Sequence, residues 1–135
     1  MLDELLKTSV NIRLDKAKEC LRDAEMTLSI GLYATAANRS YYCILHSMRA
    51  ALIAVDFSSR KHSGIIAEFR QRYIKNEIFP KEFSDIIKNA FSIRNDSDYE
   101  DFYIISKEEV AQQVENAKVF LASIEEYLKT LIYEV

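Results

Sequence analysis

The chain is short of the residues that interrupt regular secondary structure. Its 135 residues include two glycines, one proline and no tryptophan. Because glycine and proline end helices and build turns, their scarcity favours long helices joined by short connections and argues against a sheet of many strands. Two isolated glycines also cannot build the glycine-rich loops that hold phosphates in many nucleotide-binding enzymes.

Cysteine and histidine are just as scarce, with two of each. Cys20 and Cys43 lie within apolar helical patterns, and the chain lacks the Cys-x-x-Cys and His-x-x-x-His pairs of a zinc site. We therefore expect two buried thiols, and neither a disulfide nor a zinc site. The chain has no Glu-x-x-His pair, which excludes the usual di-iron bundle. We expect no metal and no cofactor.

An excess of positive charge is also absent. The net charge is -3 and the isoelectric point is near 5.5, which excludes a globally basic nucleic-acid-binding protein; the 18 Lys and Arg still allow a local basic site. No apolar run approaches the roughly 20 residues of a membrane span, and the N-terminus lacks a signal-peptide pattern. We expect a cytoplasmic protein with no membrane contact, folded as one domain over residues 1–135.

Apolar residues recur at steps of three and four along most of the chain, which is the period of a helix. This pattern predicts long helices over about 10–30 and 33–55, a shorter one over about 62–73, and two more that begin near Pro80 and Ser106. The second stripe, which Leu45 and Leu52 widen, is typical of a central helix. The sequence predicts an all-α fold, an up-and-down bundle of four long helices plus a shorter helix.

Local signals place several helix ends. Gly31 suits the end of the first long helix, Pro80 suits the first turn of the fourth, and Ser106 with Glu109 forms a capping box. The fourth helix is expected to direct one set of apolar side chains inward. These are Phe83, Ile86, Ile87, Ala90 and Phe91.

The segment Arg94–Tyr103 combines a cation on an apolar face with what we expect to be a loop of acids and tyrosines. Arg94 follows Ala90 by one helical turn, so it should face the same way, and a buried guanidinium needs partners. An ion pair with Asp96 or Asp98 is one interpretation, and a ligand site is the other. A calcium loop is excluded, because Asp101 and Lys107 stand where a glycine and a glutamate are required.

A second polar line runs along the central helix. Arg39, Tyr42, His46 and Arg49 are spaced by three and four residues and should project from one strip. Such a strip could line a binding cleft or contribute to a subunit interface.

Three stretches together resemble the HEPN family (higher eukaryotes and prokaryotes nucleotide-binding). They are Arg94–Tyr99, with the sequence Arg-Asn-Asp-Ser-Asp-Tyr; 31–42 with its continuation through His46 to Leu52; and the capped last helix. The resemblance runs from about Leu14 to Leu131. It implies a bundle of four or five helices and a homodimer. Many members are metal-independent ribonuclease toxins paired with a nucleotidyltransferase-like antitoxin.

The resemblance also implies roles for individual residues. Arg94 corresponds to the phosphate-binding arginine of the family motif and Asn95 to its polar neighbour. The motif histidine has no counterpart, since Tyr99 stands five residues after Arg94 and a tyrosine with a pKa near 10 is a poor base at neutral pH. The Asp-Tyr form of the motif is similar to the branch that binds nucleotides or polyanions without established cleavage. His46 is the remaining candidate for a catalytic imidazole.

Three functions follow as hypotheses. The first is a dimeric module that binds a nucleotide or RNA phosphate, beside a nucleotidyltransferase-like partner that could modify Tyr99 or Tyr103. The second is a ribonuclease toxin with Arg94, Tyr99 and His46 as candidate catalytic residues. The third is a structural or adaptor bundle. The predicted ligand-binding residues are Arg94, Asn95, Asp98, Tyr99, Arg39, Tyr42, His46 and Arg49.

Overall fold

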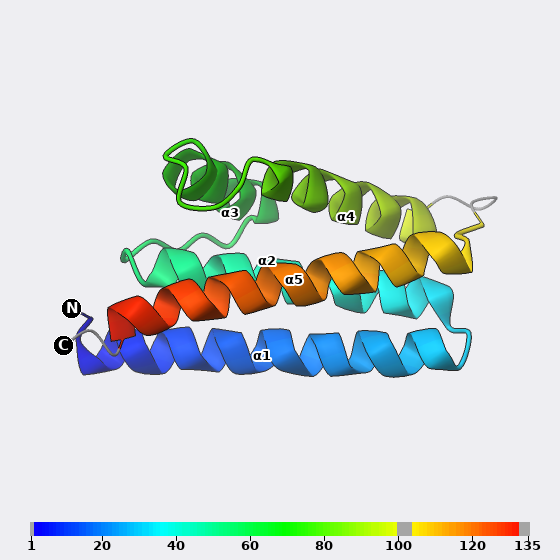
Figure 1. The fold of residues 1–135 in the computed structure, drawn as a ribbon, viewed down its shortest axis with the longest axis horizontal. Helices are drawn as coiled ribbons and strands as arrows, with labels where there is room; N and C mark the ends of the chain where they lie inside the picture. Colours follow the sequence, from blue (N-terminus) through cyan, green and yellow to red (C-terminus); the bar gives the residue numbers. More distant parts are fainter. Residues whose placement is uncertain (1, 100–103, 133–135) are drawn as a thin grey trace.

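Helices make up almost all of the described chain (Figure 1). The computed structural model describes residues 2–99 and 104–132, and the side chains of Asp98 and Tyr99 lie outside this description. The elements are α1 (Glu4–Ser29), α2 (Tyr33–Ile53), α3 (His62–Phe69), the π-helical turn η1 (Arg70–Ile74), α4 (Glu82–Tyr99) and α5 (Lys107–Ile132). The prediction of an all-α bundle of four long helices and a shorter one is confirmed.

The helix α2 is the centre of the bundle. It packs against α1, α3, α4 and α5, and Figure 1 shows α1, α2 and α5 running side by side with α3 and α4 beyond them. Most of its apolar stripe and both widening residues are buried, including Tyr41, Leu45, Met48 and Leu52. No helix of the described residues is long and apolar enough to cross a membrane.

Capping interactions set the helix ends. Asp3 accepts a hydrogen bond from the Leu6 amide at 2.8 Å, so α1 begins at Glu4 and is longer than its apolar stripe. Gly31 follows α1 with a φ of 81°, a left-handed conformation that favours glycine. At α5 the Glu109 amide donates to the Ser106 hydroxyl at 3.1 Å, which confirms the predicted capping box.

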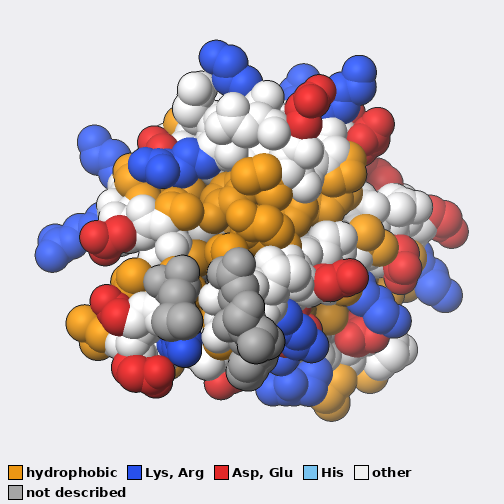
Figure 2. All heavy atoms as spheres, turned by 60° about the vertical axis from the view of Figure 1, so that its left-hand side comes forward, with side chains coloured by type: hydrophobic (Ala, Val, Ile, Leu, Met, Phe, Trp, Pro, Cys, Tyr) orange, Lys and Arg blue, Asp and Glu red, His pale blue; other side chains and the backbone are white. Residues whose placement is uncertain are grey.

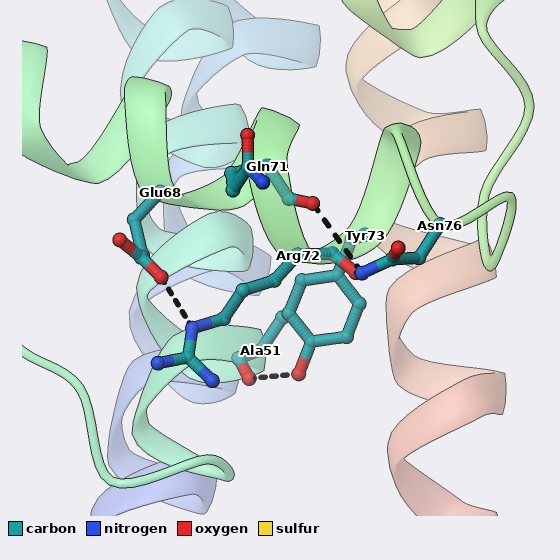
Figure 3. Close-up of polar contacts among 6 residues, drawn as sticks. All are labelled: Ala51, Glu68, Gln71, Arg72, Tyr73 and Asn76. Atoms are coloured by element: carbon teal, nitrogen blue, oxygen red, sulfur yellow. Dashed lines mark hydrogen bonds and ion pairs between the residues drawn. The ribbon is translucent and has the colours of Figure 1, made fainter.

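The predicted helix over 62–73 departs from α-helical geometry at η1, which is a π-helical turn. The wider turn directs Tyr73 into the core, where its hydroxyl donates to the Ala51 carbonyl near the end of α2 at 2.5 Å. That carbonyl lies in the last turn of α2, where intrahelical partners run out. On the outer side Arg72 pairs with Glu68 (Figure 3). The predicted short helix is therefore present, but its last turn is π-helical, which the hydrogen bond of Tyr73 favours.

The segment after Arg94 was expected to be a loop, and this was wrong for its first residues. The helix α4 continues to Tyr99, since no glycine or proline follows Pro80. Arg94 is half-buried on the side of Ala90 and Ile87, as its spacing predicted. Phe91 was expected to point inward, but its side chain is 43% exposed. The register of α4 thus directs Ala90, and not Phe91, into the core.

Candidate functional site

An open cleft of about 690 Å³ lies where α1, α2 and the start of α3 meet. Its lining residues come from α1, α2, the connection after α2, and the first turn of α3. They are Arg13, Tyr42, Leu45, His46, Arg49, Ser58, Ser59, Arg60 and His62. Three of them are arginines, two are histidines and none is an acid. The cleft is therefore a local basic site on a protein of negative net charge.

Antiparallel packing of α1 on α2 brings the cations together. Arg13 lies as far before the end of α1 as Arg49 lies after the start of α2, so the two side chains meet across the hairpin. The ion pairs of the described residues join Lys7 to Glu4, Lys18 to Glu125 and Arg72 to Glu68. None of them uses Arg13, Arg49 or Arg60, so these guanidinium charges are not neutralised by carboxylates of the described chain.

Burial and the neighbouring Arg13 guanidinium keep the imidazole of His46 neutral. Its Nδ1 lies 3.2 Å from the Arg13 guanidinium, and because arginine can only donate, Nδ1 must be the acceptor. Burial, followed by the charges of Arg13, Lys16, Arg49 and Arg39, lowers the pKa of His46 to about 4. His46 is therefore poorly suited to accept a proton near neutral pH.

The connection between α2 and α3 is fixed against the cleft. Arg49 donates to the Ser59 carbonyl at 2.7 Å, and the Ser59 hydroxyl accepts from the Lys61 amide at 3.2 Å. A Cβ at Gly64 would come within 2.7 Å of the Ser59 hydroxyl oxygen. Glycine at this position therefore allows the connection to approach α3 closely, which sets the position of His62.

An aromatic and cationic cluster lies beside the cleft. The Arg94 guanidinium lies over the rings of Tyr41 and Tyr42, 5.3 and 5.7 Å from their centroids, and it donates to the Tyr42 hydroxyl at 3.4 Å. The Arg39 guanidinium also lies over Tyr42, at 5.2 Å. The Tyr41 hydroxyl lies 3.0 Å from Nδ1 of His62. Tyr42 thus connects the predicted arginine of α4 with the cleft.

The structure brings most of the predicted site residues together, in two groups. Tyr42, His46 and Arg49 line the cleft, while Arg39 and Arg94 lie against the Tyr42 ring beside it. Asn95 is not among the lining residues. The predictions for Asp98, Tyr99 and Tyr103 concern side chains outside the described part of the chain.

Among the lining residues that the sequence did not predict, three carry arginine or histidine side chains: Arg13, Arg60 and His62. The register of the α1–α2 hairpin could have indicated Arg13, because Gly31 marks the turn and equal distances from it place Arg13 opposite Arg49. No comparable signal exists for Arg60 and His62, whose positions depend on the tertiary path of the connection. Within residues 2–99 and 104–132, no group of three or more His, Cys, Asp and Glu could hold a metal ion.

The fold and the cleft define an all-α bundle with a basic site between α1, α2 and α3. Comparison with known proteins then gives the family: the HEPN domain model matches residues 10–127, and the chain belongs to this family. A UPF0332 protein of Thermotoga maritima is 32% identical over 116 residues, which cover 86% of this chain and 88% of that protein. A Methanocaldococcus jannaschii protein named as a candidate toxin is 28% identical over 115 residues, 85% and 78% of the two chains.

Solved structures share the fold. The structure of TT1696 from Thermus thermophilus aligns with a TM-score of 0.72 at 19% identity, covering 87% of this chain and 96% of that one. The structure of ST0689, described as an archaeal HEPN homologue, aligns with a TM-score of 0.64 at 21% identity, covering 89% and 98%. At these identities the likeness shows the helical arrangement.

Proposed function

We propose that this HEPN-domain protein binds the phosphate groups of a nucleotide or of single-stranded RNA in the basic cleft. The observation that carries this proposal is the set of Arg13, Arg49 and Arg60 in one cleft without carboxylate partners among the described residues. Guanidinium groups match phosphate oxygens in shape and charge. Grouping such charges without partners is unfavourable in the free protein, and a bound anion would offset it.

Titration calorimetry with a short single-stranded RNA and with a 5′-mononucleotide tests this proposal. Replacing Arg13 or Arg49 by glutamine should weaken binding at least severalfold, since each removes a charge-assisted contact. Arg72→Gln is the matched control, because Arg72 lies on η1, pairs with Glu68 and does not line the cleft. If three cations contact the RNA backbone, log K should fall with log salt with a slope of about −2.

Two outcomes would contradict phosphate binding in the cleft. One is the absence of RNA and nucleotide binding by the wild-type protein at low salt. The other is an equal loss of affinity in Arg49→Gln and Arg72→Gln, which would mean that binding follows total charge and not the cleft.

A ribonuclease toxin is the second candidate function. Two relatives from Methanocaldococcus jannaschii are named as candidate toxins, which favours this possibility. Growth arrest on expression, together with RNA cleavage that Arg94→Ala abolishes, would support it. Intact cellular RNA and normal growth would exclude it. The low pKa of His46, about 4, makes its imidazole a weak base near neutral pH and argues against that residue as the base.

We further propose that the protein acts as a homodimer, and that a nucleotidyltransferase-like protein is its partner. Figure 2 shows hydrophobic side chains gathered in the middle of one face of the molecule. A separate groove of about 340 Å³ between α3 and α4 includes Ile66, Ile87 and the exposed ring of Phe91. Apolar surface of this kind supports self-association. Light scattering after gel filtration tests the dimer, and co-purification with the product of a neighbouring gene tests the partner.

A further inference from the structure

His62 occupies a fixed position at the edge of the cleft. It is the first residue of α3 and follows the connection that Arg49 and Gly64 hold in place. Its ring packs against both tyrosines of α2, with centroid distances of 5.8 Å to Tyr41 and 5.8 Å to Tyr42. The imidazole is half-buried and lines the cleft. Its orientation is therefore set by packing before any ligand arrives.

Tyr41 determines which nitrogen of His62 is available to a ligand. The Tyr41 side chain is 1% exposed, and a buried hydroxyl requires a hydrogen-bond partner. Burial raises the pKa of Tyr41, so the phenol keeps its proton and can donate to Nδ1 of His62 at 3.0 Å. With Nδ1 as acceptor, the ring proton lies on Nε2. Nε2 has no hydrogen bond to a described residue.

The two imidazoles of the cleft thus differ in what they can do. His46 gives its Nδ1 lone pair to Arg13, and protonation there would break that contact and place two cations together. His62 gives its Nδ1 lone pair to a neutral phenol, which can turn to accept if Nδ1 gains a proton. A hydroxyl partner therefore tolerates both charge states of the ring, whereas a guanidinium tolerates only the neutral one.

The groups that face His62 are cationic or neutral. Arg49 comes from α2, Arg94 from α4 and Arg60 from the connection, and the neighbouring phenols are Tyr41 and Tyr42. Arg13 of α1 lines the same cleft. Burial, then the charges of Arg49 and Arg94, lowers the pKa of His62. An anion bound among these arginines would reverse this effect, because it would stabilise a positive ring.

We propose that His62, positioned by Tyr41, contacts a phosphate oxygen bound in the cleft through Nε2 and takes up a proton from solvent as the phosphate binds. The inference rests on the proposed phosphate binding and names the residue that links that binding to pH. The balanced change is a neutral imidazole plus one solvent proton, giving an imidazolium beside the bound anion. Tyr41 acts only through His62 and is a positioning residue.

Proton-linked binding is measured most directly with sulfate, which keeps a constant charge between about pH 5 and 8, where a histidine titrates. The chain has two histidines, so imidazole NMR signals are assigned by a single variant. Saturating sulfate should raise the pKa of His62 by about one unit, which corresponds to roughly tenfold tighter binding by the protonated form. Calorimetry with the short RNA across the same pH range should show the same dependence.

Two variants distinguish the role of His62 as a hydrogen-bond donor from its ability to change charge. His62→Gln keeps an amide donor near the position of Nε2 but cannot titrate, so its affinity should vary less than about twofold with pH. Tyr41→Phe removes the hydroxyl that positions His62, so the affinity for the RNA should depend less on pH. Arg49 and Arg60 stay in place in this variant. Thermal unfolding checks that each variant is folded, and NMR of the wild-type protein gives the answer even if one is not.

The outcomes distinguish this inference from the proposed function. If RNA or sulfate binds while the pKa of His62 stays unchanged, the inference is wrong and phosphate binding in the cleft stands. Unaltered pH dependence in His62→Gln would also overturn the inference. If neither probe binds the wild-type protein, both proposals fail.

Discussion

The contact between Arg13 and His46 gives a prediction that tests the electrostatics of the cleft without any ligand. Arg13→Met removes the guanidinium but keeps a long side chain at the same position. The pKa of His46, about 4 in the wild-type protein, should rise because one of its causes is removed. It should stay below 6.5, because burial is the largest cause and Arg49 remains nearby.

The expected increase in the pKa of His46 can be worked out from its distance to the Arg13 guanidinium. Two unit charges about 4 Å apart interact by roughly 4 kcal/mol at an effective dielectric constant of 20. The His46 ring is half-exposed, and solvent screening reduces this severalfold, to about 1–1.5 kcal/mol. A pKa unit corresponds to about 1.4 kcal/mol, so we expect an increase of roughly one unit. Lys16→Met is the control, because Lys16 acts on His46 by charge without a hydrogen bond and should change its pKa less.

The same shift predicts how stability depends on pH. The pKa of His46 is lowered in the folded state, so between pH 6.5 and about 4 the unfolded chain binds more protons. Stability from this residue is complete above pH 6.5 and is lost as the pH falls towards 4. The full shift corresponds to about 3 kcal/mol, which screening at a half-exposed ring reduces to about 1–2 kcal/mol.

Urea unfolding of wild-type protein and His46→Gln at several pH values isolates this contribution from that of the carboxylates. The free energy of unfolding should fall more steeply with decreasing pH in the wild type than in the variant. Imidazole NMR gives the pKa values directly. The reasoning is refuted if wild-type His46 titrates near 6.5, or if Arg13→Met leaves its pKa unchanged.

Three further predictions concern the scaffold. Tyr73→Phe should lower the free energy of unfolding by about 1–3 kcal/mol in urea titrations, since it leaves the Ala51 carbonyl without its donor; an unchanged midpoint would mean that water replaces the phenol. Gly31→Ala should cost about 1 kcal/mol by the same measurement, because φ is 81° and no neighbouring atom obstructs the new Cβ. Ser106→Ala should cost about 1 kcal/mol through loss of the α5 cap, and Ser106→Asp should restore most of it if capping is the cause.

The helical architecture could be predicted from the sequence because its signals are local and periodic. The apolar stripes of α2 and α5, the left-handed Gly31 and the Ser106 cap all act within a few residues. The errors occur where tertiary contacts decide the outcome. Tyr73 requires a π turn in order to reach Ala51, which no local pattern encodes. The acids after Arg94 were interpreted as a loop, although nothing in that segment ends a helix before Tyr99.

The candidate site was predictable in the same uneven way. The spacing of Tyr42, His46 and Arg49 along one helix was sufficient to place them on one strip, and the structure brings them to one cleft. Their partners come from other elements. Arg13 could be inferred from hairpin register, but His62 enters only because Gly64 and Arg49 fix the preceding connection against α3. A spacing argument on one helix cannot find such a residue.

The absence of a histidine after Arg94 therefore has a different meaning in three dimensions than in the sequence. The Arg94 guanidinium packs on the rings of Tyr41 and Tyr42, and His62 contacts the same two rings. The Tyr41 hydroxyl also forms a hydrogen bond with His62. Arg94 and His62 are thus far apart in the chain but pack against the same pair of aromatic rings. A hydroxyl partner is compatible with both charge states of His62, whereas the Arg13 guanidinium beside His46 favours the neutral ring. If the cleft has a group that can exchange protons near neutral pH, the geometry favours His62 over His46.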